Sequence, residues 1–368
     1  MNMNMNKIIL IFLCLAVSFS IIFVSVSWGD EKLLYATRYG IPRTYATILK
    51  TKVQVFAIDY HKGESKLVFS DEKLPIVVLS RYGAGGHSVV MVSVKEKVFV
   101  SAAERNSYVS KGERLGHSIY ELFLDNSNKF RKVVDVIGDH AISEMFIDPS
   151  GNKIGYLNYI SEKPFIFIHE AKTGNLLYKI DAAKIFRDCF ASDIGWLSDS
   201  KRLFLTLDIA GDYLTPADHK KIGTYLMNED GSDLVKLPSS LFVFPKKKGF
   251  RKFSNISEFI GEMPDGTYIV SDTKFKIGYH GQEASSFIYA VNPRTKSQKE
   301  ISLKVSEGLN WVKLSPSGKY IAYTEQIYNR DIGYIWIKDL ESGEESKAFS
   351  FPAKSFETDI ILIGWIEN

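Results

Sequence analysis

LNWVKLSPSGKYIAYTEQIYNRDIGYIWIKDLESGEESKAFSF, at residues 309–351, contains four short runs rich in β-branched and aromatic residues. Turns rich in Ser, Pro and Gly separate these runs, which is the usual sequence signature of short antiparallel strands. In the second run, the side chains at residues 320–324 would lie alternately on the two faces of an extended chain. The segment therefore predicts four strands of one small sheet.

The same pattern recurs along the chain at intervals of about 50 residues, the spacing of propeller and solenoid repeats. Clear copies lie at residues 145–180, 193–238 and 258–303, and weaker copies lie at residues 33–70 and 89–136. No stretch after residue 30 shows sustained helical periodicity. We therefore expect an all-β protein built from six copies of a four-stranded antiparallel unit.

The two ends of the repeat region complement each other. The copy at residues 33–70 lacks its opening strand, whereas an extra strand, DIILIGWIEN, stands at residues 359–368. Its Ile-Gly-Trp, at 363–365, also occurs at 194–196, in the opening strand of another copy. We therefore expect the C-terminal strand to join the N-terminal unit. This pairing closes a six-bladed β-propeller and removes the exposed sheet edges of a linear array.

Four turns of the repeats resemble a known sequence family. They read SPSGKYIAY at 315–323, DPSGNKIGY at 148–156, LSDSKRLFL at 197–205 and MPDGTYIVS at 263–271. This pattern is similar to the Ser-Pro-Asp-Gly-Lys repeat of TolB-type six-bladed β-propellers. The resemblance implies a single TolB-like propeller domain over residues 30–368. Because the matching residues are turn and packing positions, the resemblance is specific for the fold and not for a function.

The segment at residues 1–29 has the pattern of a targeting sequence. Lys7 is the only charge before Asp30, and residues 8–28 form an uncharged apolar run. With the small residues Ser27 and Gly29 at its end, this pattern predicts a signal peptide cut before Asp30. The run is also long enough to remain as an uncleaved membrane anchor. We expect an exported protein, periplasmic or extracellular, or one anchored to the membrane through residues 8–28.

Composition excludes several classes of function. The chain has 46 Lys and Arg against 43 Asp and Glu, a surplus too small to indicate a nucleic-acid partner. Its two cysteines, Cys14 and Cys189, exclude a disulfide framework and a cysteine-rich metal site. No Gly-x-Ser-x-Gly nucleophile elbow occurs in the sequence. We therefore predict no catalytic residues and no cofactor.

The long connections of the predicted propeller all open on one face. They comprise the loops between second and third strands, at 38–51, 103–117, 208–223 and 272–286, and the blade junctions at 71–88, 181–192 and 238–255. The turns of the opposite face are tight. We call the face with the long connections the long-loop face and the opposite face the tight-turn face. One-sided growth of loops indicates a binding surface, although long loops could also merely cover the mouth of the channel.

Our leading hypothesis is a monomer that binds a protein or peptide of the cell envelope through the long-loop face. Tyr and Arg dominate binding hot spots. The candidate contacts are Arg43, Tyr45, Tyr82, Arg105, Tyr108, Arg114, Arg187, Tyr213 and Tyr279. A basic run, Lys246 to Lys248 with Arg251 and Lys252, also lies on this face. Such a run is usually solvated, but it could attract an acidic partner or anionic lipid headgroups.

Histidines leave two other hypotheses open. Five of them fall on the predicted long-loop face, namely His87, His117, His140, His219 and His280. No pair has the His-x-x-x-His spacing of a helical metal site, so ordinary loop histidines are the simpler interpretation. Propeller lyases, however, build metal sites from histidines of separate blades. A metal-assisted saccharide lyase or hydrolase at the channel mouth is therefore the second hypothesis, and a saccharide-binding propeller is the third.

Overall fold

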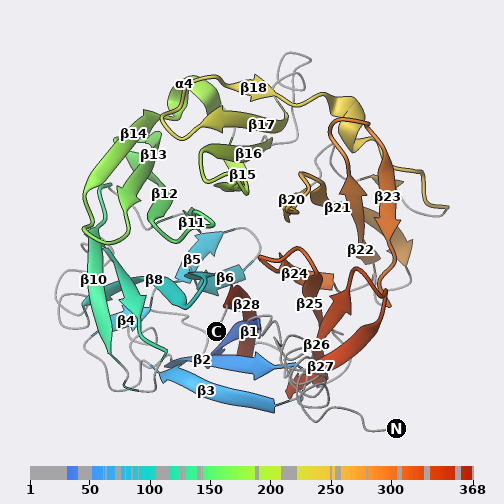
Figure 1. The fold of residues 1–368 in the computed structure, drawn as a ribbon, viewed down its shortest axis with the longest axis horizontal. Coiled ribbons are helices and arrows are strands. Elements are labelled where there is room, and N and C mark those ends of the chain that lie inside the picture. The colour runs from blue at the N-terminus through green and yellow to red at the C-terminus, as the bar shows by residue number, and fades with distance from the viewer. Residues whose placement is uncertain are drawn as a thin grey trace, which may run out of the picture.

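A computed structural model of the chain shows a ring of six β-sheets (Figure 1). The predicted six-bladed propeller is confirmed. The structure describes residues 31–39, 52–60, 62, 64–70, 76–78, 80–83, 86–89, 91–104, 117–124, 127, 129–138, 142, 144–186, 190–208, 222–248, 251–252, 258–278, 281–304, 309–326, 332–352 and 358–366. The predicted leader at residues 1–29 lies outside the described residues. No helix among the described residues is long and apolar enough to cross a membrane.

Blade one joins the two ends of the propeller, as predicted. It contains β28 (Thr358–Ile366), β1 (Lys32–Tyr39), β2 (Lys52–Asp59) and β3 (Glu64–Ser70), in that order from the inside of the ring outward. Strands β28 and β1 are antiparallel, and Leu33 pairs with Trp365. The closure rests on a continuous strand pair rather than on side-chain contacts alone.

The other five blades take their strands in chain order. Blade two has β7 (Met91–Val94), β8 (Lys97–Glu104), β9 (Ser118–Leu122) and β10 (Phe130–Asp135). Blade three has β11 (Glu144–Ile147), β12 (Lys153–Ile160), β13 (Lys163–Glu170) and β14 (Leu176–Asp181). Blade four has β15 (Phe190–Trp196), β16 (Arg202–Asp208), β17 (Gly223–Asn228) and β18 (Val235–Lys236).

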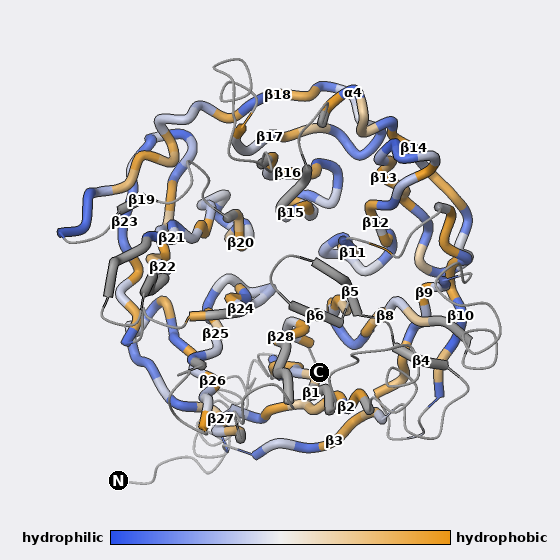
Figure 2. The backbone as a smooth tube through the Cα atoms, turned by 180° about the vertical axis from the view of Figure 1, so that it is seen from behind, coloured by the Kyte–Doolittle hydropathy of each residue, from blue (hydrophilic) through white to orange (hydrophobic). Residues whose placement is uncertain are grey.

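Blades five and six complete the ring. Blade five has β20 (Glu258–Glu262), β21 (Tyr268–Gly278), β22 (Gly281–Val291) and β23 (Gln298–Ile301). Blade six has β24 (Leu309–Leu314), β25 (Tyr320–Gln326), β26 (Ile332–Asp339) and β27 (Glu345–Pro352). Strands β11, β15, β20, β24 and β28 line the inside of the ring in both views (Figures 1 and 2).

The hydrophobic core consists of clusters between neighbouring blades. Val55 and Ile363 of blade one pack with Val98 of blade two. Ala322 of blade six belongs to one cluster with Trp365 of blade one. Because a blade has a neighbour on each side, both of its faces bury apolar side chains, which stabilises the ring. This accounts for the many aromatic and β-branched residues on both faces of the strands.

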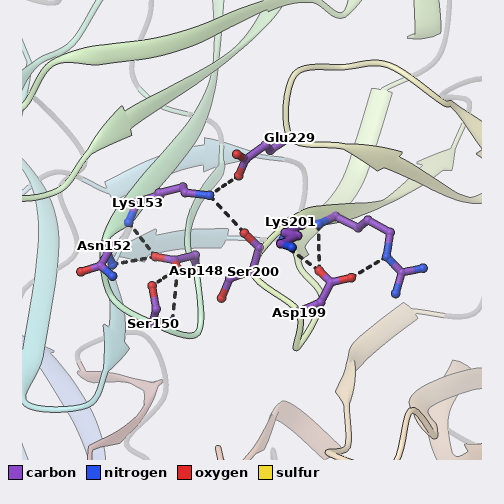
Figure 3. A network of polar contacts seen from close by, with 9 residues as sticks. Asp148, Ser150, Asn152, Lys153, Asp199, Ser200, Lys201 and Glu229 are labelled. Atoms are coloured by element: carbon purple, nitrogen blue, oxygen red, sulfur yellow. Dashed lines mark hydrogen bonds and ion pairs between the residues drawn. The ribbon is translucent and has the colours of Figure 1, made fainter.

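Side-chain caps hold the tight turns in shape. In blade three, Asp148 accepts hydrogen bonds through Oδ1 from the backbone N–H groups of Asn152, at 2.8 Å, and Lys153, at 2.6 Å. Asp199 caps the equivalent turn of blade four, where the N–H groups of Lys201 and Arg202 donate at 2.8 and 2.9 Å (Figure 3). The repeated turn motif is therefore a structural feature, because its polar residues satisfy backbone donors.

The tight turns also connect neighbouring blades. Lys153 of blade three donates through Nζ to the carbonyl of Ser200 in blade four, at 3.2 Å, and pairs with Glu229 of that blade (Figure 3). Ser198 of blade four donates through Oγ to Glu262 of blade five, at 2.6 Å. These contacts give the tight-turn face a structural role in the assembly of the ring.

Candidate functional site: a basic pocket on the long-loop face

Secondary structure beyond the four-stranded blades lies on the connections of the long-loop face. Among the described residues it comprises β4 (Ile76–Val78), β5 (Ser80–Gly83), β6 (Gly86–Val89), α4 (Ala183–Phe186), η1 (Ser239–Phe242) and β19 (Arg251–Lys252). All of these elements occur in the junctions predicted at 71–88, 181–192 and 238–255. The junctions therefore contain regular secondary structure, and two of them add a strand, β4 or β19, to a blade.

The prediction of a loop at residues 272–286 is wrong. Strands β21 and β22 form one continuous hairpin that pairs from Tyr268 with Val291 as far as Gly278 with Gly281. Glycines and charged residues, which this stretch contains, are typical of a loop. The pairing extends further because β19 pairs with Lys274 and Phe275 of β21, beyond the end of β20, and so supports the added length.

A second hairpin, β5 with β6, lies towards the axis of the ring (Figure 1). It brings together two of the predicted site residues, because Tyr82 and His87 are register partners across it. The side chains of these two residues lie outside the described part of the structure. The hairpin belongs to the junction between β3 of blade one and β7 of blade two.

Most of the other predicted site residues belong to segments outside the described part of the chain. Arg43, Tyr45, Arg105, Tyr108, Arg114, Arg187, Tyr213, Tyr279, His140, His219 and His280 lie outside the described residues. His117 is described and precedes β9. Its Nδ1 is buried without a hydrogen-bond partner among the described residues, and burial lowers its pKa. Within the part of the chain that the structure describes, no three His, Cys, Asp or Glu side chains gather as a metal site would require.

The basic run of the sequence borders a pocket of about 690 Å³. The pocket lies where the segment between η1 and β19 meets the β21–β22 hairpin of blade five. Its lining consists of Val243, Phe244, Lys246, Lys247, Lys248, Asp272 and Lys274. We call it the basic pocket. It joins one of the long junctions to the extended hairpin, so two elaborations of the long-loop face meet in it.

A buried ion pair lies in the wall of the basic pocket. Asp272 is 1% exposed, and its Oδ2 lies 3.0 Å from Nζ of Lys274, two residues further along β21. The same Nζ donates a hydrogen bond to the carbonyl of Pro245 at 2.6 Å. Oδ1 of Asp272 is buried and has no hydrogen-bond partner among the described residues. The carboxylate is therefore neutralised on one side and has an unused acceptor on the other.

The neighbouring strand places further polar atoms on the same face of the hairpin. Ser285 and Tyr289 of β22 pair with Lys274 and Val270 of β21. The hydroxyl groups of Ser285 and Tyr289 are also buried without a partner in the described structure. Burial, together with the charges of Glu300 and Asp272, raises the pKa of Tyr289 far above its usual value, so this phenol stays protonated as a potential donor.

The rim of the pocket carries positive charge that is only partly neutralised. Lys247 binds Glu300 at 2.6 Å and lies 4.8 Å from the ring centre of Phe287. Lys246 and Lys248 are exposed, and neither forms an ion pair among the described residues. Two exposed cations and a buried carboxylate, with one oxygen that no described residue donates to, thus line the same pocket. This set of groups can bind an anion that also donates a hydrogen bond.

The sequence indicates the lysines at the rim of the basic pocket but not the buried residues of its wall. The basic run is visible in the sequence as a cluster of charges, whereas Asp272 and Lys274 fall in a stretch that the sequence analysis predicts to be a loop. One signal could have identified them. They stand two residues apart in YIVSDTKFKIG, residues 268–278, a stretch with the alternation of a strand, and this spacing puts two opposite charges on one strand face.

A second pocket, of about 530 Å³, lies between blades one and two on the tight-turn side. Charged side chains of both signs line it, including Lys32, Asp59, Glu64, Lys66 and Glu96. With Glu121 the lining holds four carboxylates and two lysines, but Asp59 and Glu121 already pair with Lys62 and Arg131. The basic pocket is therefore the better candidate for a functional site.

The comparisons with known proteins agree with this architecture. No protein-family model and no curated protein matches the sequence. Among solved structures, TolB from Acinetobacter baumannii is 14% identical, with 90% of this chain and 67% of that chain covered and a TM-score of 0.50. A putative TolB from Agrobacterium tumefaciens is 13% identical, with 90% and 98% covered and a TM-score of 0.48.

A more distant similarity is to an oligogalacturonate lyase in complex with manganese. That protein is 10% identical, with 85% of this chain and 78% of that chain covered and a TM-score of 0.43. Similarities at such low identity concern the fold and not the chemistry. The closed ring of six blades, the repeated turns and the likeness to TolB agree with one another. In fold, the chain is a TolB-like six-bladed β-propeller.

Proposed function

We propose that this protein is an exported, non-catalytic propeller that binds a protein or peptide of the cell envelope through its long-loop face. One observation carries the proposal. Every described element that is added to the six four-stranded blades belongs to a connection of that face. Loops held by a rigid scaffold are the usual location of binding residues. The tight-turn face contributes caps and contacts between blades instead.

Export is supported by the pattern of residues 1–29. The leader carries a single charge, Lys7, continues as an apolar run and ends in small residues before Asp30. We propose cleavage before Asp30, with retention as an anchor as the alternative. Mass determination of the protein recovered from its source cells distinguishes the two, because only cleavage removes the mass of residues 1–29.

Capture of a partner tests the binding role. The full chain with a C-terminal tag is incubated with envelope extract from the source cells, and captured proteins are identified by mass spectrometry. We expect one protein to be held by the wild type and lost from a variant with Tyr108→Ala, Tyr213→Ala and Tyr279→Ala.

A control variant removes exposed apolar side chains from the tight-turn face instead. It carries Phe123→Ala, Leu234→Ala and Val235→Ala, at positions that are 40%, 40% and 58% exposed. We expect it to capture the same protein as the wild type. If the tyrosine variant captures normally and the control does not, the partner binds the opposite face. Elemental analysis of the same preparation is a further check, since a stoichiometric metal would favour the metal-assisted lyase or hydrolase.

A further inference from the structure

We infer that the basic pocket binds an acidic peptide segment of the partner, with Lys246 and Lys248 holding its carboxylates and Asp272 accepting one of its N–H groups. The inference rests on the proposed function, because it specifies what one part of the long-loop face recognises. It uses three features of the pocket: two cations that pair with no described carboxylate, a buried acceptor and an apolar lining.

The cations select for negative charge at the rim. Lys247 is already engaged by Glu300, at 2.6 Å, and Lys274 is engaged by Asp272, at 3.0 Å. Lys246 and Lys248 have no such partner in the described part of the chain and are exposed to solvent. An incoming carboxylate can therefore pair with them without breaking an existing ion pair. Lysine ammonium groups on flexible stems suit carboxylates that arrive in different positions.

The buried acceptor disfavours an anionic ligand that has no hydrogen-bond donor. Oδ1 of Asp272 is shielded from solvent and accepts no hydrogen bond from the described residues. A buried acceptor without a partner is unfavourable, so a ligand that donates to it gains affinity. A simple anion brings no donor to this oxygen and is repelled by its charge. A peptide brings backbone N–H groups as well as carboxylates.

The apolar lining favours a peptide over a saccharide. Val243 is 68% exposed at the pocket, and the alkyl stems of the lysines add further apolar surface. Sugars usually stack on a free aromatic face, but the ring of Phe244 is stacked on Tyr289, with centroids 4.1 Å apart and planes 14° apart. An aliphatic side chain can contact Val243 directly. The volume of about 690 Å³ lies in the range of small-ligand sites and suits a few residues of extended peptide.

A peptide library tests the inference. Acetylated and amidated hexapeptides, with each position drawn from Asp, Glu, Asn, Gln, Leu, Val and Gly, are passed over the immobilised full chain, and bound sequences are read by mass spectrometry. We expect enrichment of peptides with Asp or Glu beside Leu or Val, and depletion of their Asn and Gln analogues. Enrichment of uncharged peptides, or of none, would overturn the inference.

Two pairs of lysine substitutions locate the binding. Lys246→Ser with Lys248→Ser removes the rim charges, whereas Lys172→Ser with Lys201→Ser removes two exposed lysines from the tight-turn face. For the best peptide, measured by isothermal titration calorimetry, we expect the rim variant to bind about fivefold to tenfold more weakly, as for the loss of two exposed ion pairs. The control should bind like the wild type. Equal binding by the rim variant and the wild type contradicts the inference.

The role of Asp272 is tested on the peptide, so that the protein keeps its fold. Each backbone amide of the best peptide is N-methylated in turn, which removes one N–H donor at a time. We expect one position to lose at least about fivefold in affinity, the effect of an unsatisfied buried acceptor. A peptide that tolerates methylation at every position makes no such hydrogen bond. Direct binding of inorganic phosphate or glucuronic acid, measured by the same calorimetry, without binding of any library peptide would show that the pocket takes a free anion instead.

The failure of this inference can be told apart from failure of the proposed function. If the wild type and the rim variant capture the same envelope protein equally well, the long-loop face binds a partner but the basic pocket does not contribute to that binding. If the wild type captures nothing, the proposed function fails, and the library result then stands as a separate measurement of what the pocket binds.

Discussion

The two faces of the propeller are built from the same repeats but differ in how their polar groups are used. On the tight-turn face, Asp148 and Asp199 accept hydrogen bonds from the backbone of their own turns, and Lys153 connects blade three to blade four. On the long-loop face, no described residue donates to the buried Oδ1 of Asp272 or forms an ion pair with Lys246. Near the tight-turn face, His169 and Trp196 also have a buried ring nitrogen without a partner among the described residues. An unsatisfied group therefore indicates a ligand only where it lies in a pocket, as Asp272 does.

The largest expected effect comes from removing the closing strand. Deletion of residues 358–368 removes β28, which pairs with β1 over its whole length and contributes Leu362 and Trp365 to the core. We expect the deleted protein to lose cooperative unfolding, because the inner edge of blade one and its apolar face become exposed.

Urea denaturation followed by circular dichroism measures this effect. The control is deletion of residues 367–368 alone, which leaves all of β28 in place and should unfold like the wild type. A cooperative transition of the 358–368 deletion at the wild-type midpoint would show that the ring does not depend on its closure.

Contacts between tight turns are tested by two glycines with the same backbone conformation. Gly318 has φ +72° and Gly343 has φ +76°. A Cβ at Gly318 would lie 2.6 Å from Cδ of Pro264 in the neighbouring blade, whereas a Cβ at Gly343 would meet nothing within 4 Å among the described atoms. Both substitutions to Ala strain the backbone, but only Gly318→Ala also forces two blades apart.

We expect Gly343→Ala to lower the free energy of unfolding by about 1 kcal/mol, from the positive φ alone. Gly318→Ala should lower it by roughly 3 kcal/mol, since overpacking adds to the strain. Chemical denaturation of both variants gives the difference. Equal losses would mean that the turns of blades five and six are not in close contact. The tight-turn face would then not stabilise the junction between these two blades.

The same contrast explains what could be predicted from sequence. The turn around Ser315 to Gly318 and its strands carry local signals, so the blades were predictable, and the shared Ile-Gly-Trp predicted the closure. The basic pocket is not local. Its wall forms only because segment 243–248 folds over β21 and places Pro245 beside Lys274. The length of the β21–β22 hairpin likewise depends on β19, which pairs with it from another part of the chain.

A smaller effect is expected from His169, near the tight-turn face. Its Nδ1 lies 2.9 Å from the carbonyl of Gly174, its ring stacks on Tyr156, and the side chain is 3% exposed. Burial lowers its pKa below the usual value of 6.5. The unfolded chain therefore binds a proton more readily than the folded protein, and stability falls as the pH drops below about 6.5.

We expect His169→Gln to reduce this fall in stability between pH 7 and pH 5, measured as the free energy of unfolding at each pH. The absolute stability of the variant is also lower at pH 7, because the hydrogen bond to Gly174 and the ring stacking change. The slope with pH is therefore the informative quantity. A variant whose stability has the same pH dependence as the wild type would show that His169 is not the group that titrates.

The smallest effect on stability is expected for substitution of the two rim lysines, and this result would distinguish most clearly how the two faces use their charged groups. Lys246→Ser with Lys248→Ser changes exposed side chains that no described carboxylate pairs with, so the free energy of unfolding should stay within about 0.5 kcal/mol of the wild type. Loss of peptide affinity in that same variant would then be a direct effect on binding. A large loss of stability would instead make these lysines part of the fold, and the long-loop face would resemble the tight-turn face in its use of charge.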